Sequence, residues 1–294
     1  MSVPDVPGAP PHSLLIWEKI KILRELPQSE NVTLNQTILD ALQIKVRNLD
    51  IDGQPSNGGT QFIEVMPWQE AKRRIDEYKP WLFWDFTNRE YFKDIWEANW
   101  TCVLLATWFS STENDNKPER DGLLPLHETA GWESIPWEPA CRKMAQDEDQ
   151  SYIWAVKGGL VSRDKSKPHV TLLLIDRGYS LRQDIRLVEK QVENDKLLWS
   201  EVWTILNYLL TRAADLDYQD HRATPVTLIS CTGTRGRIVQ GYMGKDPNNG
   251  EHVVNIQKTN FISLDLPHGN DQENFMRVFG WMAGKPIGDT LNDG

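Results

Sequence analysis

The stretch that decides the fold is HVTLLLI, from His169 to Ile175. It is a short, mostly apolar run that contains the β-branched residues Val170, Thr171 and Ile175, and such runs are typical of a buried β-strand. The strongest helical pattern of the chain follows at about Ile185 to Ala214, and a second strand-like run, PVTLIS, spans Pro225 to Ser230. Asp195 interrupts the helical pattern, so the alternative is a helix that begins only there. The order strand, helix, strand predicts one supersecondary unit.

Further strands are expected on both sides of this unit. Tyr152 to Val161 reads as a strand that pairs with His169 to Ile175, and the glycines Gly158 and Gly159 inside it indicate a bulge or a close backbone approach. After Pro225, two strands surround the turn from Thr232 to Arg237, and another strand follows at His252 to Ile256. The sequence therefore predicts an α+β fold in which a mixed β-sheet packs against a long buried helix.

The first half of the chain is expected to be mostly helical. The expected helices follow Ser13, Thr33 or Asn35, Pro67 and Thr87 or Asn88, with a shorter one around residues 136–146. Residues 44–51 alternate in polarity, so a strand is the alternative there. The domain prediction is a flexible tail at 1–12, a mostly helical Trp-rich region at 13–150, an α/β core at 151–284 and a flexible tail at 285–294. One integrated domain is the alternative.

Composition narrows the classes of protein. The chain has 294 residues, of which 39% are hydrophobic and 25% charged, values that are typical of a folded globular protein. The net charge of −10 disfavours diffuse binding to nucleic acid or anionic membranes. No secretory signal or long apolar run is present, which predicts a soluble intracellular protein, cytoplasmic or nuclear, without a membrane partner.

Tryptophan is unusually frequent. Eight of the 13 tryptophans lie between positions 68 and 137, namely Trp68, Trp81, Trp84, Trp96, Trp100, Trp108, Trp132 and Trp137. Large aromatic side chains dominate both protein cores and binding surfaces, so two interpretations stand: an aromatic core or an aromatic groove for a ligand.

Motifs for metal, phosphate or nucleophilic chemistry are weak. The six histidines show no spacing that places two ligands on one face, and the three cysteines are far apart, so no metal site and no cofactor are predicted. The segment from Thr232 to Arg237 contains two glycines but leads into a strand, which favours a hairpin turn over a phosphate loop.

A basic stretch is the clearest charged feature. Between Val156 and Lys190 there are eight basic and four acidic residues. One interpretation is a solvated loop, and the other is a contact face for an anion or a nucleic acid. The candidate contact residues are Arg163, Lys165, Lys167, Arg235 and Arg237.

The order strand, strand, long helix, strand hairpin over residues 150–256 resembles the core of restriction-endonuclease-like nucleases. That family implies metal-dependent cleavage by an acid that starts the second core strand and by an acid-x-Lys at the end of the next one. The corresponding positions read Gly158-Gly159-Leu160 and Ile175-Asp176-Arg177. Asp176 is out of phase with that pattern and should face the other side of the sheet than Ile175. The resemblance therefore implies a degenerate, non-catalytic member.

Three functions follow from these observations. The first is a non-catalytic binding or interaction module with a protein partner, because the sequence contains no recognisable constellation of catalytic groups and interface-type aromatics are abundant. The second is an enzyme for a small molecule, with Asp85, Asp176 and Arg177 in a pocket between the helical half and the sheet; Asp176 and Arg177 are the candidate catalytic residues. The third is nucleic-acid binding through the basic stretch.

Overall fold

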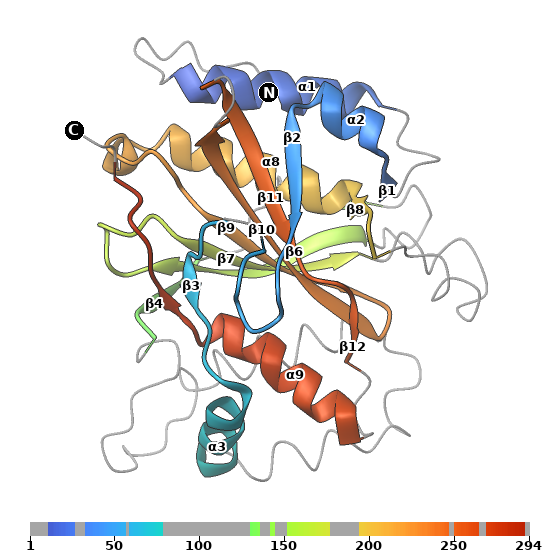
Figure 1. The fold of residues 1–294 in the computed structure, drawn as a ribbon, viewed down its shortest axis with the longest axis vertical. Coiled ribbons are helices and arrows are strands. Elements are labelled where there is room, and N and C mark those ends of the chain that lie inside the picture. The colour runs from blue at the N-terminus through green and yellow to red at the C-terminus, as the bar shows by residue number, and fades with distance from the viewer. Residues whose placement is uncertain are drawn as a thin grey trace.

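The computed structural model describes the following parts of the chain: residues 11–26, 33–56, 59–78, 130–135, 142–144, 152–176, 194–246, 250–264 and 269–291. One large mixed β-sheet dominates it (Figure 1). Its main strands run in the order β2-β11-β10-β9-β7-β6-β4. They span Ile44–Asn48 (β2), His252–Lys258 (β11), Arg235–Lys245 (β10), Val226–Thr232 (β9), Val170–Asp176 (β7), Tyr152–Ser162 (β6) and Trp132–Ile135 (β4).

Shorter strands extend this sheet or form two-stranded ribbons. In the sheet, β12 (Ile262–Ser263) pairs with β10, and β5 (Arg142–Met144) pairs with β6. One ribbon joins β1 (Thr33–Leu34) to β8 (Leu197–Leu198). The other joins β3 (Ile63–Glu64) to β13 (Lys285–Pro286).

The predicted strand, helix, strand unit is confirmed. Strand β7 runs parallel to β9, with Val170 opposite Val226, and the helix α8 (Trp199–Ala213) connects them. Residues 194–196 form a turn before β8, so the helix begins at Trp199 rather than near Ile185. The α+β prediction, with a mixed sheet and a long buried helix, therefore holds, and Asp195 does lie before the start of the helix.

Helices cover both faces of the sheet (Figure 1). The helices α1 (Pro11–Glu25), α2 (Gln36–Ala41) and α8 lie on one face, and α3 (Trp68–Tyr78) and α9 (Gly269–Met282) lie on the other. A short 3-10 turn, η2 (Leu216–Tyr218), follows α8. Among the described residues, none of these helices is long and apolar enough to cross a membrane.

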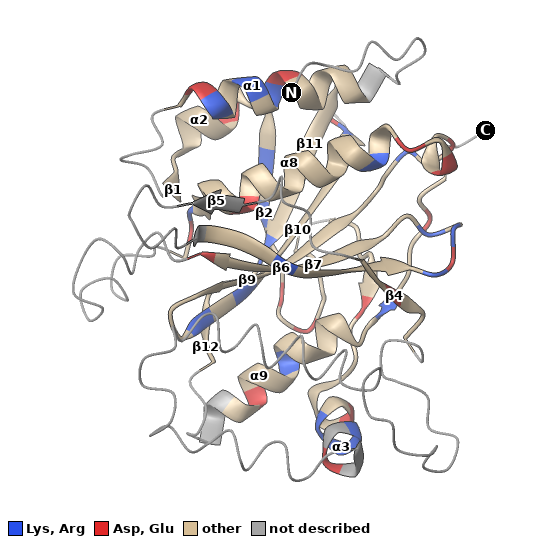
Figure 2. Ribbon diagram, turned by 180° about the vertical axis from the view of Figure 1, so that it is seen from behind, with Lys and Arg blue, Asp and Glu red and all other residues tan. Residues whose placement is uncertain are grey.

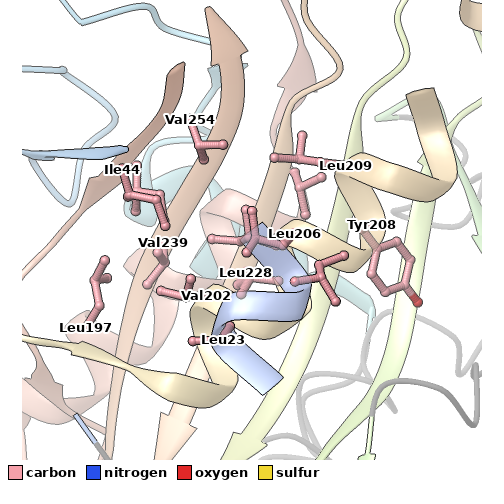
Figure 3. Close-up of a cluster of buried hydrophobic side chains, with 14 of the residues drawn as sticks. Leu23, Ile44, Leu197, Val202, Leu206, Tyr208, Leu209, Leu228, Val239 and Val254 are labelled. Atoms are coloured by element: carbon pink, nitrogen blue, oxygen red, sulfur yellow. The ribbon is translucent and has the colours of Figure 1, made fainter. Parts of the chain in front are cut away.

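Successive side chains of the central strands belong alternately to two separate hydrophobic cores, one on each face of the sheet. On β7, Leu172 and Leu174 belong to the core beneath α8, whereas Leu173 and Ile175 belong to the core beneath α9. This is the two-residue period of a strand that is buried on both faces. Figure 3 shows the α8 core, in which side chains of the helix pack on those of the strands: Val202, Leu206, Leu209, Leu228, Val239 and Val254.

The N-terminal half contributes strands to the same sheet. Strand β2 pairs in parallel with β11, so the strand alternative for residues 44–51 is correct, and β4 pairs with β6. Of the eight clustered tryptophans, Trp132 is fully buried and Trp68 packs against the α9 core. The other six, and the helix expected after Thr87 or Asn88, lie outside the described residues.

Two local expectations differ from the structure. The expected helix at 136–146 is wrong where the chain is described, because Arg142–Met144 forms strand β5 along the edge of β6. Pairing with a sheet edge satisfies the backbone of such a short segment, and this tertiary contact outweighs helical propensity. The expected tail at 285–294 is held in place over residues 285–291, where the Ile287 amide donates to the Phe62 carbonyl at 2.9 Å.

Candidate functional site

Charged side chains gather where the parallel strands β7 and β9 end and α8 begins. Ligand sites of α/β sheets favour such carboxyl ends, so this place is the natural candidate site. Asp176 ends β7, and Ser200 and Glu201 lie in the first turn of α8. Arg237 is the third residue of β10, and Lys258 ends β11. We call these five residues the charged cluster. All five side chains are buried.

The ion pair between Glu201 and Arg237 is the centre of the charged cluster. Both side chains are 0% exposed, and the guanidinium meets the carboxylate side-on, with Nε donating to Oε1 at 2.8 Å and Nη2 donating to Oε2. The Leu198 amide also donates to Oε2 at 2.8 Å, so Glu201 closes the N-terminus of α8 from within. The pair therefore ties α8 to the sheet.

Arg237 makes two further contacts around this pair. Its Nη2 donates to the Lys196 carbonyl at 2.9 Å, and its guanidinium carbon lies 4.1 Å from the centre of the Phe261 ring. A planar guanidinium suits such combined hydrogen bonding and stacking better than an ammonium group does. Arginine is thus the residue that this position requires.

Asp176 lies beside the ion pair and contacts the same helix. Its side chain is 3% exposed, and the Ser200 hydroxyl donates to its Oδ2. Its neighbour Ile175 points into the core beneath α9. The two residues therefore face opposite sides of the sheet, as expected from the two-residue period of a strand.

Lys258 adds a second positive charge. Its side chain is 3% exposed, and its Nζ donates to the Asn194 carbonyl. Burial lowers the pKa of Lys258, and the nearby positive charge of Arg237 lowers it further. These two cations are therefore close enough to influence one another.

The predicted contact residues divide between two distant places. Arg235 lies near the charged cluster, with Nη2 donating to Asn194 Oδ1 at 3.4 Å. The turn between β6 and β7, which carries Arg163, Lys165 and Lys167, lies at the opposite end of the strands from β12, the partner of the start of β10 (Figure 2). The structure therefore does not bring the two sets together.

The lysines of that turn have partners within the chain. Lys165 forms an ion pair with Asp217 at 2.8 Å, and Lys167 donates to the Pro286 carbonyl at 3.0 Å. Arg177 and Asp85, the other predicted site residues, lie outside the described residues. Of the predicted site residues that the structure describes, Asp176, Arg235 and Arg237 lie near one site.

Glu201 and Lys258 were missed by the sequence reasoning. Glu201 lies three residues after the N-cap of α8, the position at which an acid commonly caps the N-terminus of a helix. The N-cap residue is Leu198 instead of the usual Ser or Thr, so the sequence lacks the capping-box pattern. Lys258 ends an apolar strand and carries no signal in the sequence. Within the described part of the chain, no group of three or more His, Cys, Asp or Glu residues is placed to hold a metal ion.

A second polar region lies on the opposite face of the sheet. The register places four buried side chains in one line across adjacent strands, and we call them the neutral row: Thr171, Thr227, Gln240 and Gln257. Gln240 donates to the Thr227 hydroxyl at 3.0 Å, and Gln257 donates to the Thr60 carbonyl at 2.9 Å. This region contains hydrogen bonds without formal charges.

His169 lies two residues before the neutral row. It is 1% exposed, and its Nε2 lies 2.9 Å from the Ile287 carbonyl. Burial lowers the pKa of His169 to about 4, and the charge of Lys167 acts in the same direction. The ring is therefore neutral at physiological pH and holds the C-terminal segment by donating from Nε2.

The outer face of α1 carries an apolar surface. Leu14 is 52% exposed and Ile22 is 40% exposed, while Ile16, Ile20 and Leu23 are buried on the inner face. Trp17 is half-buried beside them, and Lys21 Nζ lies 5.8 Å from the centre of its ring. The exposed Glu18, four residues from both Leu14 and Ile22, lies between them on this face, and Glu25 lies near its end. We call Leu14, Trp17 and Ile22 the α1 patch.

The chain was compared with protein-family models, with curated proteins and with solved structures. None of the three comparisons found a match.

Proposed function

We propose that this protein is a non-catalytic binding module, a degenerate nuclease-like fold that recognises another protein. One observation carries the proposal: the Glu201 carboxylate, at the centre of the candidate site, already accepts hydrogen bonds from groups of the protein itself. Glu201 accepts two hydrogen bonds from Arg237 and one from the Leu198 amide, and it is 0% exposed. A carboxylate held in this way serves architecture rather than chemistry.

Asp176 supports the same conclusion. Its Oδ2 accepts the Ser200 hydroxyl, and its side chain is 3% exposed. A metal-dependent nuclease needs carboxylates that reach a bound ion and a water molecule. The carboxylates of the charged cluster instead fix the start of α8 on the sheet.

The α1 patch is the surface on which we place the protein partner. Two exposed aliphatic side chains and a half-buried tryptophan, interspersed with the charged Glu18 and Lys21, offer a partner both apolar and polar contacts. The patch belongs to a helix whose other face is buried through Ile16, Ile20 and Leu23. A rigid scaffold therefore presents it.

The first experiment tests the absence of catalysis. Plasmid DNA is incubated with the full chain and Mg²⁺ or Mn²⁺, and we expect the plasmid to stay intact. Robust cleavage that disappears in Asp176→Ala would overturn the proposal.

The second experiment tests the partner surface. Tagged wild-type protein is crosslinked in cell extract, and the captured protein is identified and then bound in purified form. The double variant Leu14→Glu/Ile22→Glu should lose this binding. The control variant Leu216→Glu changes a residue outside the α1 patch that is 76% exposed, and it should keep the binding. Equal binding by both variants, or no capture together with turnover of a metabolite, contradicts the proposal.

A further inference from the structure

The turn between β6 and β7 carries an exposed serine among basic residues. It reads Arg163-Asp164-Lys165-Ser166-Lys167, and all of these residues except Lys167 are exposed. Serine kinases that select basic substrates recognise such a charge pattern around the serine. Among the serines and threonines of the described residues, Ser166 is the only one with an arginine three positions before it.

Few contacts hold the tip of this turn. The strands close below it, where the Ser162 amide donates to the His169 carbonyl at 3.1 Å. At the tip, the Lys167 amide donates to the Asp164 carbonyl at 2.9 Å. The amide and the hydroxyl of Ser166 both donate to Asp164 Oδ1, at 3.0 and 2.7 Å. All of these tip groups belong to the surface, so the tip can open locally and enter the active site of a kinase.

A phosphate on Ser166 changes the charge balance of the turn. The carboxylates that face its three cations are Asp164 in the turn and, beside Lys165, Asp217 and Asp215. A phosphoserine adds a charge of about −1.5 to −2. It also removes the hydroxyl that donates to Asp164 and places two negative groups next to each other. The neighbouring lysines then become the natural partners of the phosphate oxygens.

One of these lysines also holds the C-terminal segment. Lys167 is half-buried, and its Nζ donates to the carbonyl of Pro286 in β13 at 3.0 Å. The same segment is held by the pairing of β13 with β3 and by His169, whose Nε2 lies 2.9 Å from the Ile287 carbonyl. An ammonium group binds a charged phosphate oxygen more strongly than a neutral carbonyl. A phosphate on the adjacent Ser166 therefore competes with Pro286 for Lys167.

We propose that Ser166 is a phosphorylation site for a kinase that selects basic substrates, and that its phosphate draws Lys167 from Pro286 and loosens residues 285–291. In the reaction, Ser166 Oγ forms a bond to the γ-phosphorus of ATP. The bond from that phosphorus to the bridging oxygen of the β-phosphate breaks, ADP leaves, and a base of the kinase takes the hydroxyl proton. The proposal does not involve the α1 patch, so either proposal can fail without the other.

The first test is the modification itself. The full chain is incubated with Mg²⁺, ATP and a calmodulin-dependent serine kinase, and peptide mass spectrometry locates the phosphate. We expect phosphate on Ser166, and a rate at least about tenfold lower in Arg163→Ala, which loses a charge-assisted contact with the kinase. Ser180 also follows an arginine by three residues and lies outside the described residues, so Ser180→Ala is the matched control and should keep the modification of Ser166. An unmodified Ser166, or phosphate on Ser180 alone, overturns the proposal.

The second test follows residues 285–291 by amide hydrogen exchange in fully phosphorylated and unmodified protein. Loss of the Lys167 contact should speed exchange there about fivefold, while β9 exchanges as before. Lys167→Ala lacks the contact from the start, so it should exchange faster without phosphate and show no further rise with it. Lys165→Ala is the matched control, because Lys165 pairs with Asp217, and it should still respond to phosphate. Unchanged exchange on phosphorylation, or an equal response in Lys167→Ala, overturns the proposed loosening.

Discussion

The charged cluster and the neutral row lie on opposite faces of one sheet, and they solve the burial of polar groups in different ways. The charged cluster matches formal charges, with Glu201 against Arg237 at 0% exposure. The neutral row uses amides and hydroxyls, such as Gln240 on Thr227, and reaches out to backbone carbonyls. A buried charge that loses its partner is far more costly than a lost neutral hydrogen bond, so the two regions should respond very differently to substitution.

The largest effect is expected in the charged cluster. Arg237→Met leaves Glu201 buried without its counter-charge and should lower the free energy of unfolding by about 3–5 kcal/mol. Urea denaturation followed by tryptophan fluorescence measures this change. The double variant Arg237→Met/Glu201→Leu removes both charges and should recover most of the loss, because no unpaired charge remains. If the double variant is less stable than the single one, the pair does not act as described.

The next effect concerns pH and belongs to the other face. The pKa of His169 is about 4 in the folded protein against an ordinary 6.5, so the unfolded chain binds the proton more readily between these values. Stability should therefore fall as the pH is lowered from about 6.5 to about 4, by up to roughly 3 kcal/mol, and this contribution should level off below pH 4.

His169→Gln provides the control for this pH dependence. Glutamine can still donate to the Ile287 carbonyl but does not titrate in this range. The difference between the wild-type and variant stability curves isolates the histidine from the carboxylates that titrate beside it. Parallel curves from pH 7 to pH 4 would show that His169 does not control this window.

A smaller effect is expected at Asp176. Ser200→Ala removes one hydrogen bond to a buried carboxylate and should destabilise the protein by about 1.5–3 kcal/mol. Thermal unfolding measures the change. As a control, Thr211→Ala removes an exposed hydroxyl of the same helix and should lower the stability less. Equal losses for the two variants would mean that the bond to Asp176 contributes little.

The smallest effect is expected in the neutral row. Thr171 Oγ1 is buried and has no hydrogen-bond partner in the described structure, so Thr171→Val replaces an unsatisfied hydroxyl with a methyl group of similar size. The free energy of unfolding should stay within about 1 kcal/mol of the wild type, or rise. Thr227→Val, which removes the acceptor of Gln240, should be clearly worse. A large loss in Thr171→Val would reveal a partner for this hydroxyl.

The sequence predicted the local parts of this architecture well. The apolar run of β7, the helical pattern of α8 and the turn at Gly233, whose φ is +54°, all carry signals within a few residues. The opposite facing of Ile175 and Asp176 follows from the strand period alone. Local chemistry therefore determines the unit that connects β7 to β9.

The sites depended on contacts that no local pattern contains. Arg237 was expected at the surface as a candidate anion contact, but Glu201, 36 positions earlier, pairs with it in the interior. Nothing near Arg237 in the sequence indicates that partner. The neutral row likewise exists only through the register of four strands, and β5 forms only because the edge of β6 receives it.

The pairing of β2 with β11 has a consequence for how the chain folds. Ile44 lies opposite Val254, and β13 near the C-terminus pairs with β3. Contacts between residues so distant in sequence close large loops, which slows folding. During synthesis β2 stays unpaired until β11, about 200 residues later, has been made. An unpaired strand edge is prone to association with other chains. Completion of the sheet is therefore a late event, and the nascent protein should depend on chaperones until residues 252–258 leave the ribosome.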